Sequence, residues 1–156
     1  MENREFVSLF EENLFLPNLQ ARTKKDAIVE FVDLFVSQKK IKDKEILLEM
    51  LQQRESLGST GIGKGIAIPH GRTLSTTNLI IAFGKSKLGI KFKAIDGKPV
   101  HLIFMIIAPY LDKKNRYLVV LGKLVELLGK KKIREKLLQV NTFQEFKDII
   151  EGGKLK

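Results

Sequence analysis

The sequence predicts an α/β (α+β) fold, in which a mixed sheet of about five strands is sandwiched between helices on both faces. The near-continuous apolar runs at 79–83 and 100–108 are typical of strands that are buried on both faces. Segments with apolar residues at helical spacing precede and follow these runs, so helices can cover either face of the sheet. The length of 156 residues, 44% of them hydrophobic, fits one domain over residues 1–156.

The segment before the apolar runs predicts two main helices. Residues 5–10 predict a short amphipathic helical turn, and residues 14–17 predict a brief extended piece that the proline ends. Thr23 followed by Asp26 is a helix-start signature, and Asp43 is expected to cap a second helix. The residues of that second helix that we expect to face inward are Ile46, Leu47, Met50 and Leu51.

Arg54 follows that inward-facing stripe at helical spacing, three residues after Leu51 and seven after Leu47. An arginine in this position has two interpretations. Its aliphatic stem can lie along the edge of the core with the charged head in water, or the head can reach a fixed anion. On this spacing alone the two interpretations are equally good.

The segments after Arg54 complete the predicted elements. Residues 66–69 are expected to be extended, because a proline disfavours helical backbone at the residue before it. Residues 87–90 and 95–99 predict tight turns with one short edge strand between the apolar runs. Residues 115–129 and 131–139 predict helices, and Thr142 with Glu145 forms a capping box for a last one. The first of these helices is expected to bury Leu118, Leu121, Val125 and Leu128.

Composition excludes several classes of site. The absence of cysteine removes disulfides, thiolate catalysis and iron–sulfur clusters, and the two histidines do not form a His-Glu-x-x-His motif. We therefore expect no metal and no other cofactor. A leader and an apolar run of about 18 residues are also missing, which predicts a cytoplasmic protein without direct membrane insertion. The net charge of +10 is spread along the chain without a nucleic-acid-binding motif, so no nucleic-acid partner is expected.

The glycine-rich segment 58–65 comes close to a nucleotide-binding motif. Gly58, Gly63 and Lys64 have the spacing of a Walker A loop. Position 65 is glycine, where a serine or threonine should bind magnesium, and the preceding segment is predicted to be a helix where a strand is required. These two departures argue against a nucleotide-binding loop.

The same segment can bind phosphate in another way. Glycine allows positive φ, so the N–H groups of residues such as Gly61 and Gly63 can converge on an anion, while Ser59 and Thr60 add hydroxyl donors. A glycine-rich loop on its own is more often only an irregular turn. The arginine before this loop and the histidine after it shift the interpretation toward a phosphate site.

His70 has three interpretations: a core histidine that bonds to backbone, a general base, or a nucleophile. A general base needs an orienting carboxylate, yet Glu55 is the only acidic residue between positions 54 and 95. A neutral imidazole is a competent nitrogen nucleophile toward phosphorus at neutral pH. Because phosphoryl transfer needs mainly positioning and charge stabilisation, we expect a phosphohistidine at His70 with Arg54 beside it.

Residues 54–70, read as R-E-x-x-G-S-T-G-I-G-x-G-I-A-I-P-H, resemble the signature of enzyme IIA proteins of the phosphoenolpyruvate-dependent sugar phosphotransferase system. The similarity is to the fructose/mannitol class, which includes the nitrogen-regulatory branch, and it extends through residues 96–104 to the final helices. The resemblance implies a mixed sheet with helices on both sides, in agreement with the patterns above.

The resemblance also implies a function. His70 would accept a phosphoryl group from the histidine phosphocarrier protein and pass it to a cysteine of an enzyme IIB, on its own or in a membrane IIB/IIC complex, during sugar uptake. Arg54 would stabilise the phosphoryl group. Many relatives have a second active-site histidine where this chain has Tyr117, a phenol that can hydrogen-bond a phosphoryl oxygen but cannot carry positive charge. His101 is not expected to replace that histidine and is predicted to be a core or sheet-edge residue.

A regulatory role remains the alternative. In the nitrogen-regulatory branch the phosphorylation state would control which partner protein is bound, because adding a dianion beside docking residues is enough to switch an interface. Transport and regulation would use the same site, so the residues leave both open.

Overall fold

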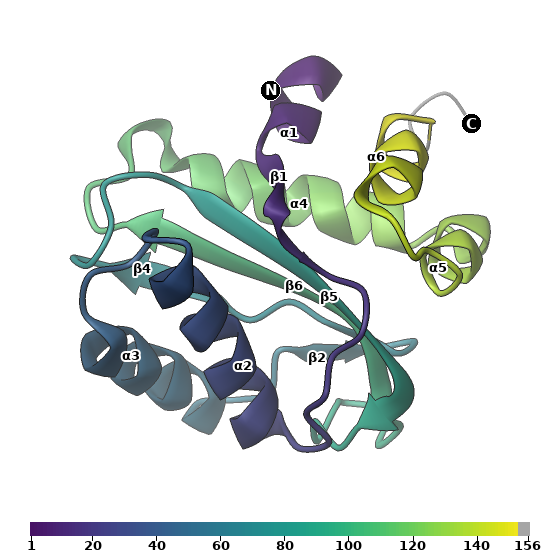
Figure 1. The fold of residues 1–156 in the computed structure, drawn as a ribbon, viewed down its shortest axis with the longest axis horizontal. Helices are drawn as coiled ribbons and strands as arrows, with labels where there is room; N and C mark the ends of the chain where they lie inside the picture. The colour runs from purple at the N-terminus through teal and green to yellow at the C-terminus, as the bar shows by residue number, and fades with distance from the viewer. Residues whose placement is uncertain (153–156) are drawn as a thin grey trace.

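The structure is a computed structural model that describes residues 1–152, apart from the side chain of Lys113. It has one mixed sheet covered by helices on both faces, as the sequence predicts (Figure 1). The strands are β1 (Phe10–Leu16), β2 (Gly61–Gly63), β3 (Ile66–Ala67), β4 (His70–Thr73), β5 (Ile80–Ile90) and β6 (Val100–Pro109). The helices are α1 (Asn3–Ser8), α2 (Lys24–Ser37), α3 (Lys44–Ser56), the 3-10 turn η1 (Lys113–Asn115), α4 (Arg116–Leu128), α5 (Lys131–Leu137) and α6 (Phe143–Gly152).

The two long strands β5 and β6 form the centre of the sheet. They pair antiparallel, β1 runs parallel to β5, and the order β1-β5-β6-β3-β2 gives the main path of the sheet. The short strands β3 and β4 follow one another along the side of β6 that β5 leaves free, both parallel to β6. This arrangement sets Ile66 opposite Leu102 and His70 opposite Ile106.

Alternate residues of β6 enter two separate cores. Ile103, Met105 and Ile107 pack on the side covered by α2 and α3, whereas Phe104 and Ile106 pack on the side covered by α4, α5 and α6 (Figure 1). Burial of both faces explains why β6 is apolar almost throughout. Because β4 pairs with β6 residue by residue, each β4 side chain lies on the same face of the sheet as its β6 partner.

The helix starts follow the predicted caps. The Asp26 N–H donates to the Thr23 hydroxyl at 3.2 Å, and the Ile46 N–H donates to the Asp43 carboxylate at 3.1 Å. The capping box before α6 is reciprocal, because the Glu145 N–H donates to the Thr142 hydroxyl and the Thr142 N–H donates to the Glu145 carboxylate. These local signals are confirmed.

Two predicted buried faces need correction. Ile46 is 49% exposed, so the inward stripe of α3 rests on Leu47 and Leu51, with Met50 packed beside it. In α4, Leu118 and Val125 are about half exposed, at 49% and 48%. The residues that α4 buries are Val120, Leu124, Leu127 and Leu128. Since α4 has apolar residues on almost every side, several different sets of its residues match helical spacing. Only contact with the sheet determines which set is buried.

The sheet is also more extensive than expected. Within residues 1–152 it has six strands instead of about five, because glycine-rich and polar segments form the short strands β2 and β4. In place of a turn at 87–90, β5 continues to Ile90 through an irregular register after Lys85. Gly89, at φ +92, adopts the left-handed conformation that this irregularity needs.

Candidate functional site

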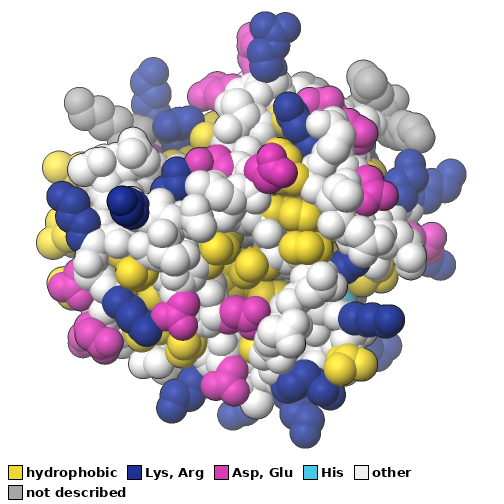
Figure 2. Space-filling model, viewed as in Figure 1, with side chains coloured by type: hydrophobic (Ala, Val, Ile, Leu, Met, Phe, Trp, Pro, Cys, Tyr) yellow, Lys and Arg dark blue, Asp and Glu magenta, His cyan; other side chains and the backbone are white. Residues whose placement is uncertain are grey.

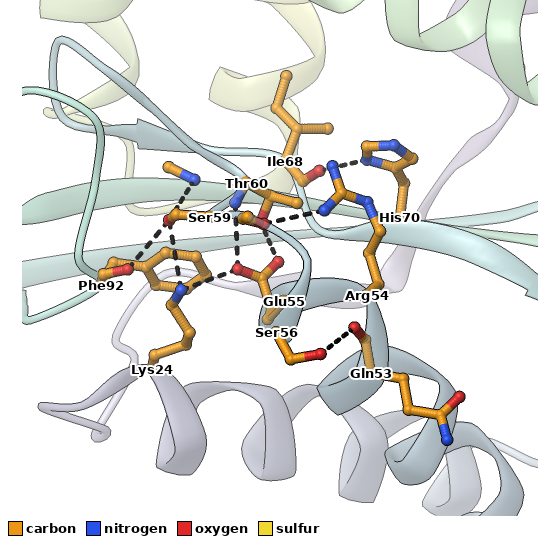
Figure 3. A network of polar contacts seen from close by, with 12 residues as sticks. Lys24, Gln53, Arg54, Glu55, Ser56, Ser59, Thr60, Ile68, His70 and Phe92 are labelled. Atoms are coloured by element: carbon orange, nitrogen blue, oxygen red, sulfur yellow. Dashed lines mark hydrogen bonds and ion pairs between the residues drawn. The ribbon is translucent and has the colours of Figure 1, made fainter.

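His70 is the first residue of β4, and its imidazole is fixed by a backbone carbonyl. The ring Nδ1 lies 2.7 Å from the carbonyl oxygen of Ile68 (Figure 3). A carbonyl can only accept a hydrogen bond, so Nδ1 carries the proton and Nε2 keeps its lone pair. Since His70 pairs with Ile106, its side chain lies on the face of the sheet covered by α4. The histidine is therefore held in one tautomer, and this bond leaves the lone pair of Nε2 unused.

Arg54 belongs to the last turn of α3 and is partly buried. Its Nη1 donates to the Gly58 carbonyl at 2.9 Å, and its side chain extends from α3 toward the His70 ring (Figure 3). The guanidinium has five N–H donors, and this bond uses one of them. The structure thus brings the two principal predicted residues to the same place.

The glycines of the loop serve a tight hairpin between β2 and β3. Gly63 and Gly65 have φ values of +93° and +79°, and Lys64 between them is also left-handed. A side chain on Gly61 would come within 2.8 Å of the Ala94 backbone, so only glycine allows this approach. The Asp96 carboxylate accepts the Lys64 N–H at 3.1 Å, and backbone N–H groups hold the pKa of Asp96 below its ordinary value.

A polar network beneath the loop was not foreseen. The buried carboxylate of Glu55 accepts the N–H and the hydroxyl of Thr60, and it pairs with the Lys24 ammonium at 2.9 Å (Figure 3). The Ser59 hydroxyl donates to the Phe92 carbonyl at 3.2 Å and accepts from Lys24. The network joins α2, α3 and the loop.

This network changes the roles of the predicted hydroxyls. Ser59 and Thr60 bond to protein groups, and the Gly61 N–H donates to the Ser59 hydroxyl at 3.0 Å, so these donors hold the loop together. Glu55 was visible in the sequence only as an isolated acid next to Arg54. Its partner Lys24 lies 31 residues earlier, in a different helix, and no local pattern connects them.

Tyr117 stands in the first turn of α4 and contacts a second arginine. Arg72 follows His70 by two residues on β4, so the two side chains share one face of the sheet. Its guanidinium carbon lies 4.9 Å from the centre of the Tyr117 ring, and Nη2 lies 3.4 Å from the Tyr117 hydroxyl. Sequence reasoning assigned Arg72 no role, although the spacing from His70 could have indicated one.

His101 lies apart from these residues. It is the second residue of β6 and partly buried, and its Nδ1 lies 2.8 Å from the Ser86 carbonyl. The expectation of a sheet histidine is confirmed. Among residues 1–152, no group of three or more His, Asp or Glu could hold a metal ion.

The site therefore combines a histidine with an available Nε2 and two guanidinium groups on neighbouring elements. A family model described as "Phosphoenolpyruvate-dependent sugar phosphotransferase system, EIIA 2" matches residues 8–153. The chain belongs to this EIIA 2 family. The family description names a phosphotransferase system, so phosphotransferase activity in general follows for this domain.

Relatives in the EIIA 2 family carry sugar-specific names. The chain is 41% identical over 146 residues to the "PTS system fructose-specific EIIABC component" of Bacillus subtilis, covering 94% of this chain but only 23% of that protein. It is 37% identical over 128 residues to the "PTS system fructose-specific EIIA component" of Haloferax volcanii, covering 82% of each. The chain thus spans about a quarter of the first relative and most of the second.

A solved structure from the nitrogen-regulatory branch also matches this EIIA 2 domain. The "Nitrogen Regulatory Protein IIA-Ntr" of Neisseria meningitidis superposes with a TM-score of 0.86 at 32% identity, over 94% of this chain and 99% of that one. The described part of the chain has no helix long and apolar enough to cross a membrane.

Proposed function

We propose that the chain is a cytoplasmic phosphoryl carrier for sugar uptake. It accepts a phosphoryl group from the histidine phosphocarrier protein onto His70 and passes it to a cysteine of an enzyme IIB. The observation that carries this proposal is the bond of 2.7 Å between Nδ1 of His70 and the Ile68 carbonyl, which leaves Nε2 as the nucleophile. The fructose-specific names of two relatives favour fructose as the sugar.

Each transfer exchanges one bond to phosphorus for another. In the first, the lone pair of His70 Nε2 attacks the phosphorus carried by the donor's histidine. The new N–P bond forms on His70, the donor's N–P bond breaks, and its electron pair returns to the donor imidazole. In the second, a cysteine thiolate of enzyme IIB attacks the phosphorus and the electron pair returns to Nε2. The proton stays on Nδ1, which donates it to the Ile68 carbonyl throughout, so no proton needs to move.

The charges around His70 stabilise the phosphoryl group in this proposal. Arg54 and Arg72 supply guanidinium groups from α3 and β4, and the Tyr117 hydroxyl adds a hydrogen-bond donor beside Arg72. Ser59, Thr60, Gly61 and Gly63 contribute by shaping the loop, because the two hydroxyls already bond to protein groups.

The test is a phosphorylation assay with phosphoenolpyruvate, enzyme I and the histidine phosphocarrier protein. We expect acid-labile label on the wild type and none on His70→Ala. His101→Ala is the matched control, since these are the two histidines of the chain, and it should be labelled normally. Label that persists in His70→Ala would refute the assignment.

A nitrogen-regulatory role is the second candidate, and the match to the Neisseria protein favours it. In that role the phosphorylated and unphosphorylated forms bind different partners. A panel of enzyme IIB proteins separates the two functions. Rapid transfer of label to a fructose-type IIB supports transport, whereas slow transfer to every IIB, together with a protein captured by only one phosphorylation state, supports regulation.

A further inference from the structure

A surface cavity lies toward the other end of β6 from His70. It has a volume of about 520 Å³ and is bordered by Lys85 and Lys87 of β5, His101 of β6 and residues of the α5–α6 connection. His101 is five residues before Ile106, the partner of His70, which corresponds to roughly 16 Å along a strand. The cavity is therefore separate from the proposed phosphohistidine site.

Lys85 places a buried ammonium at this cavity. The residue is 8% exposed, and its Nζ donates to the Val140 carbonyl. This is its one hydrogen-bond partner in the described part of the chain, although an ammonium has three N–H donors. Burial lowers the pKa of Lys85 below its ordinary value, against the attraction of Glu145. A bound anion would supply the acceptors and the charge that this ammonium lacks.

His101 adds a hydrogen-bond acceptor to the same cavity. Its Nδ1 faces the Ser86 carbonyl at 2.8 Å and therefore carries the proton, so Nε2 of the neutral ring can accept a hydrogen bond. A side chain on Gly89 would come within 3.1 Å of the His101 ring, so glycine at this position leaves room for the imidazole. Such an acceptor favours a ligand that is anionic and also carries an O–H group.

We propose that this cavity binds inorganic phosphate in its monoprotonated form, independently of His70. Lys85 and Lys87 supply positive charge, and the Nε2 of His101 accepts the O–H of the monoprotonated form. The amide side chains that also line the cavity and can donate to the remaining oxygens are Asn18, Gln139 and Asn141. Sulfate has the same shape and charge but no proton at neutral pH, so it should bind more weakly.

The bound anion would connect parts of the molecule that are distant in sequence. Lys85 and Lys87 belong to β5, whereas Gln139 and Asn141 belong to the connection between α5 and α6. An ion held by both should stabilise the folded state in proportion to its occupancy.

The test uses thermal unfolding in a His70→Ala/Arg54→Gln background, which removes the proposed phosphorylation site. We expect a Kd of about 1 mM for inorganic phosphate. Adding 10 mM phosphate, roughly ten times this Kd, should raise Tm by roughly 3 °C. Sulfate at equal ionic strength should raise it much less. No phosphate effect in this background, or an equal effect of sulfate, would overturn the proposal.

Lysine variants in the same background locate the ion. Lys85→Met should abolish the phosphate effect, and Lys87→Gln, a substitution of an exposed side chain, should weaken phosphate binding about tenfold. Lys25→Gln, an exposed lysine outside this cavity, should leave the effect unchanged. An undiminished effect in Lys87→Gln would contradict the proposal even if Lys85→Met failed to fold.

Nuclear magnetic resonance provides a readout at the cavity itself. The imidazole signals of His101 should shift on titration with inorganic phosphate, and His70→Ala should leave this titration unchanged. Glycerol phosphate, a phosphomonoester whose phosphate group is mostly the unprotonated dianion at neutral pH, should shift these signals much less. Unmoved His101 signals with inorganic phosphate, or an equal shift with glycerol phosphate, would overturn the assignment.

Discussion

Arg54 approaches His70 from the end of α3, and its Nη1 already bonds to the Gly58 carbonyl. We predict that Arg54→Lys slows phosphorylation of His70 by roughly 10- to 100-fold, because lysine keeps the charge but loses the planar fork that grips two phosphate oxygens. Rapid-quench transfer from the phosphorylated histidine phosphocarrier protein measures the rate. Thermal unfolding should change little, and an unchanged transfer rate would remove Arg54 from the mechanism.

Arg72 offers the positive charge that Tyr117 lacks. Its guanidinium stacks on the Tyr117 ring at 4.9 Å, on the same face of the sheet as His70. We predict that Arg72→Gln lowers the transfer rate by about tenfold, whereas Tyr117→Phe lowers it by about threefold at most, since phenylalanine keeps the stacking surface. The same rapid-quench assay compares the two variants. A larger loss in Tyr117→Phe than in Arg72→Gln would show that the hydroxyl matters more than the stacked cation.

The places of His70 and Arg54 in the fold could be predicted from the sequence, because both follow from local rules. Helical spacing puts Arg54 in line with Leu47 and Leu51, and the extended run before Pro69 leads into the strand that begins at His70. The hydroxyl of Thr60 could not be assigned in this way. Its direction depends on a buried carboxylate and on a lysine from another helix, so only the folded structure shows which group it binds.

At the scale of elements, α2 and α3 are joined to the loop by the ion pair of Lys24 and Glu55. Their side chains are 19% and 6% exposed, and the carboxylate also accepts from Thr60. We predict that Lys24→Met lowers the free energy of unfolding by about 2 kcal/mol, because the buried Glu55 carboxylate loses the positive charge that balances it. Urea unfolding measures this loss.

The matched control is the pair of Lys131 and Glu135 on α5, which is 81% and 62% exposed with its charged atoms 3.9 Å apart. Lys131→Met should change the free energy of unfolding by less than about 0.5 kcal/mol. In Lys24→Met/Glu55→Gln the loss of unfolding free energy should be smaller than the sum of the losses in the two single variants, because the double variant has no unpaired buried charge. Equal losses for Lys24→Met and Lys131→Met would contradict the role given to the buried pair.

Elements were predictable to the extent that local signals define them. The caps at Thr23, Asp43 and Thr142 mark the starts of three helices correctly. The buried face of α4 and the extension of β5 to Ile90 depend instead on the pairing and packing of distant segments. Short strands such as β2 have too few apolar residues to form a pattern, so the number of strands was underestimated.

At the scale of the whole molecule, the net charge of +10 is not concentrated in one band on the face seen in Figure 2. Lysine and arginine side chains project around the outline of this face, with acidic side chains between them. Among the carboxylates that hold loops together by accepting backbone N–H groups are Asp96 beneath the hairpin and Glu145 in the first turn of α6. These bonds, with the Thr142 hydroxyl at Glu145, hold the pKa of each carboxylate below its ordinary value.

These lowered pKa values predict how stability depends on pH. Around the ordinary values of 3.8 for Asp96 and 4.5 for Glu145, the unfolded chain binds more protons than the folded chain. The stabilisation is therefore fully present above these values and is lost as the pH falls through the folded-state pKa values. We predict that Asp96→Asn/Glu145→Gln is less stable than wild type at pH 7 but loses less stability between pH 7 and pH 3. Urea unfolding across this range measures both effects, with Glu12→Gln, a substitution of an exposed acid on β1, as the control. A double variant whose stability falls with pH as steeply as that of wild type would show that other groups govern acid unfolding.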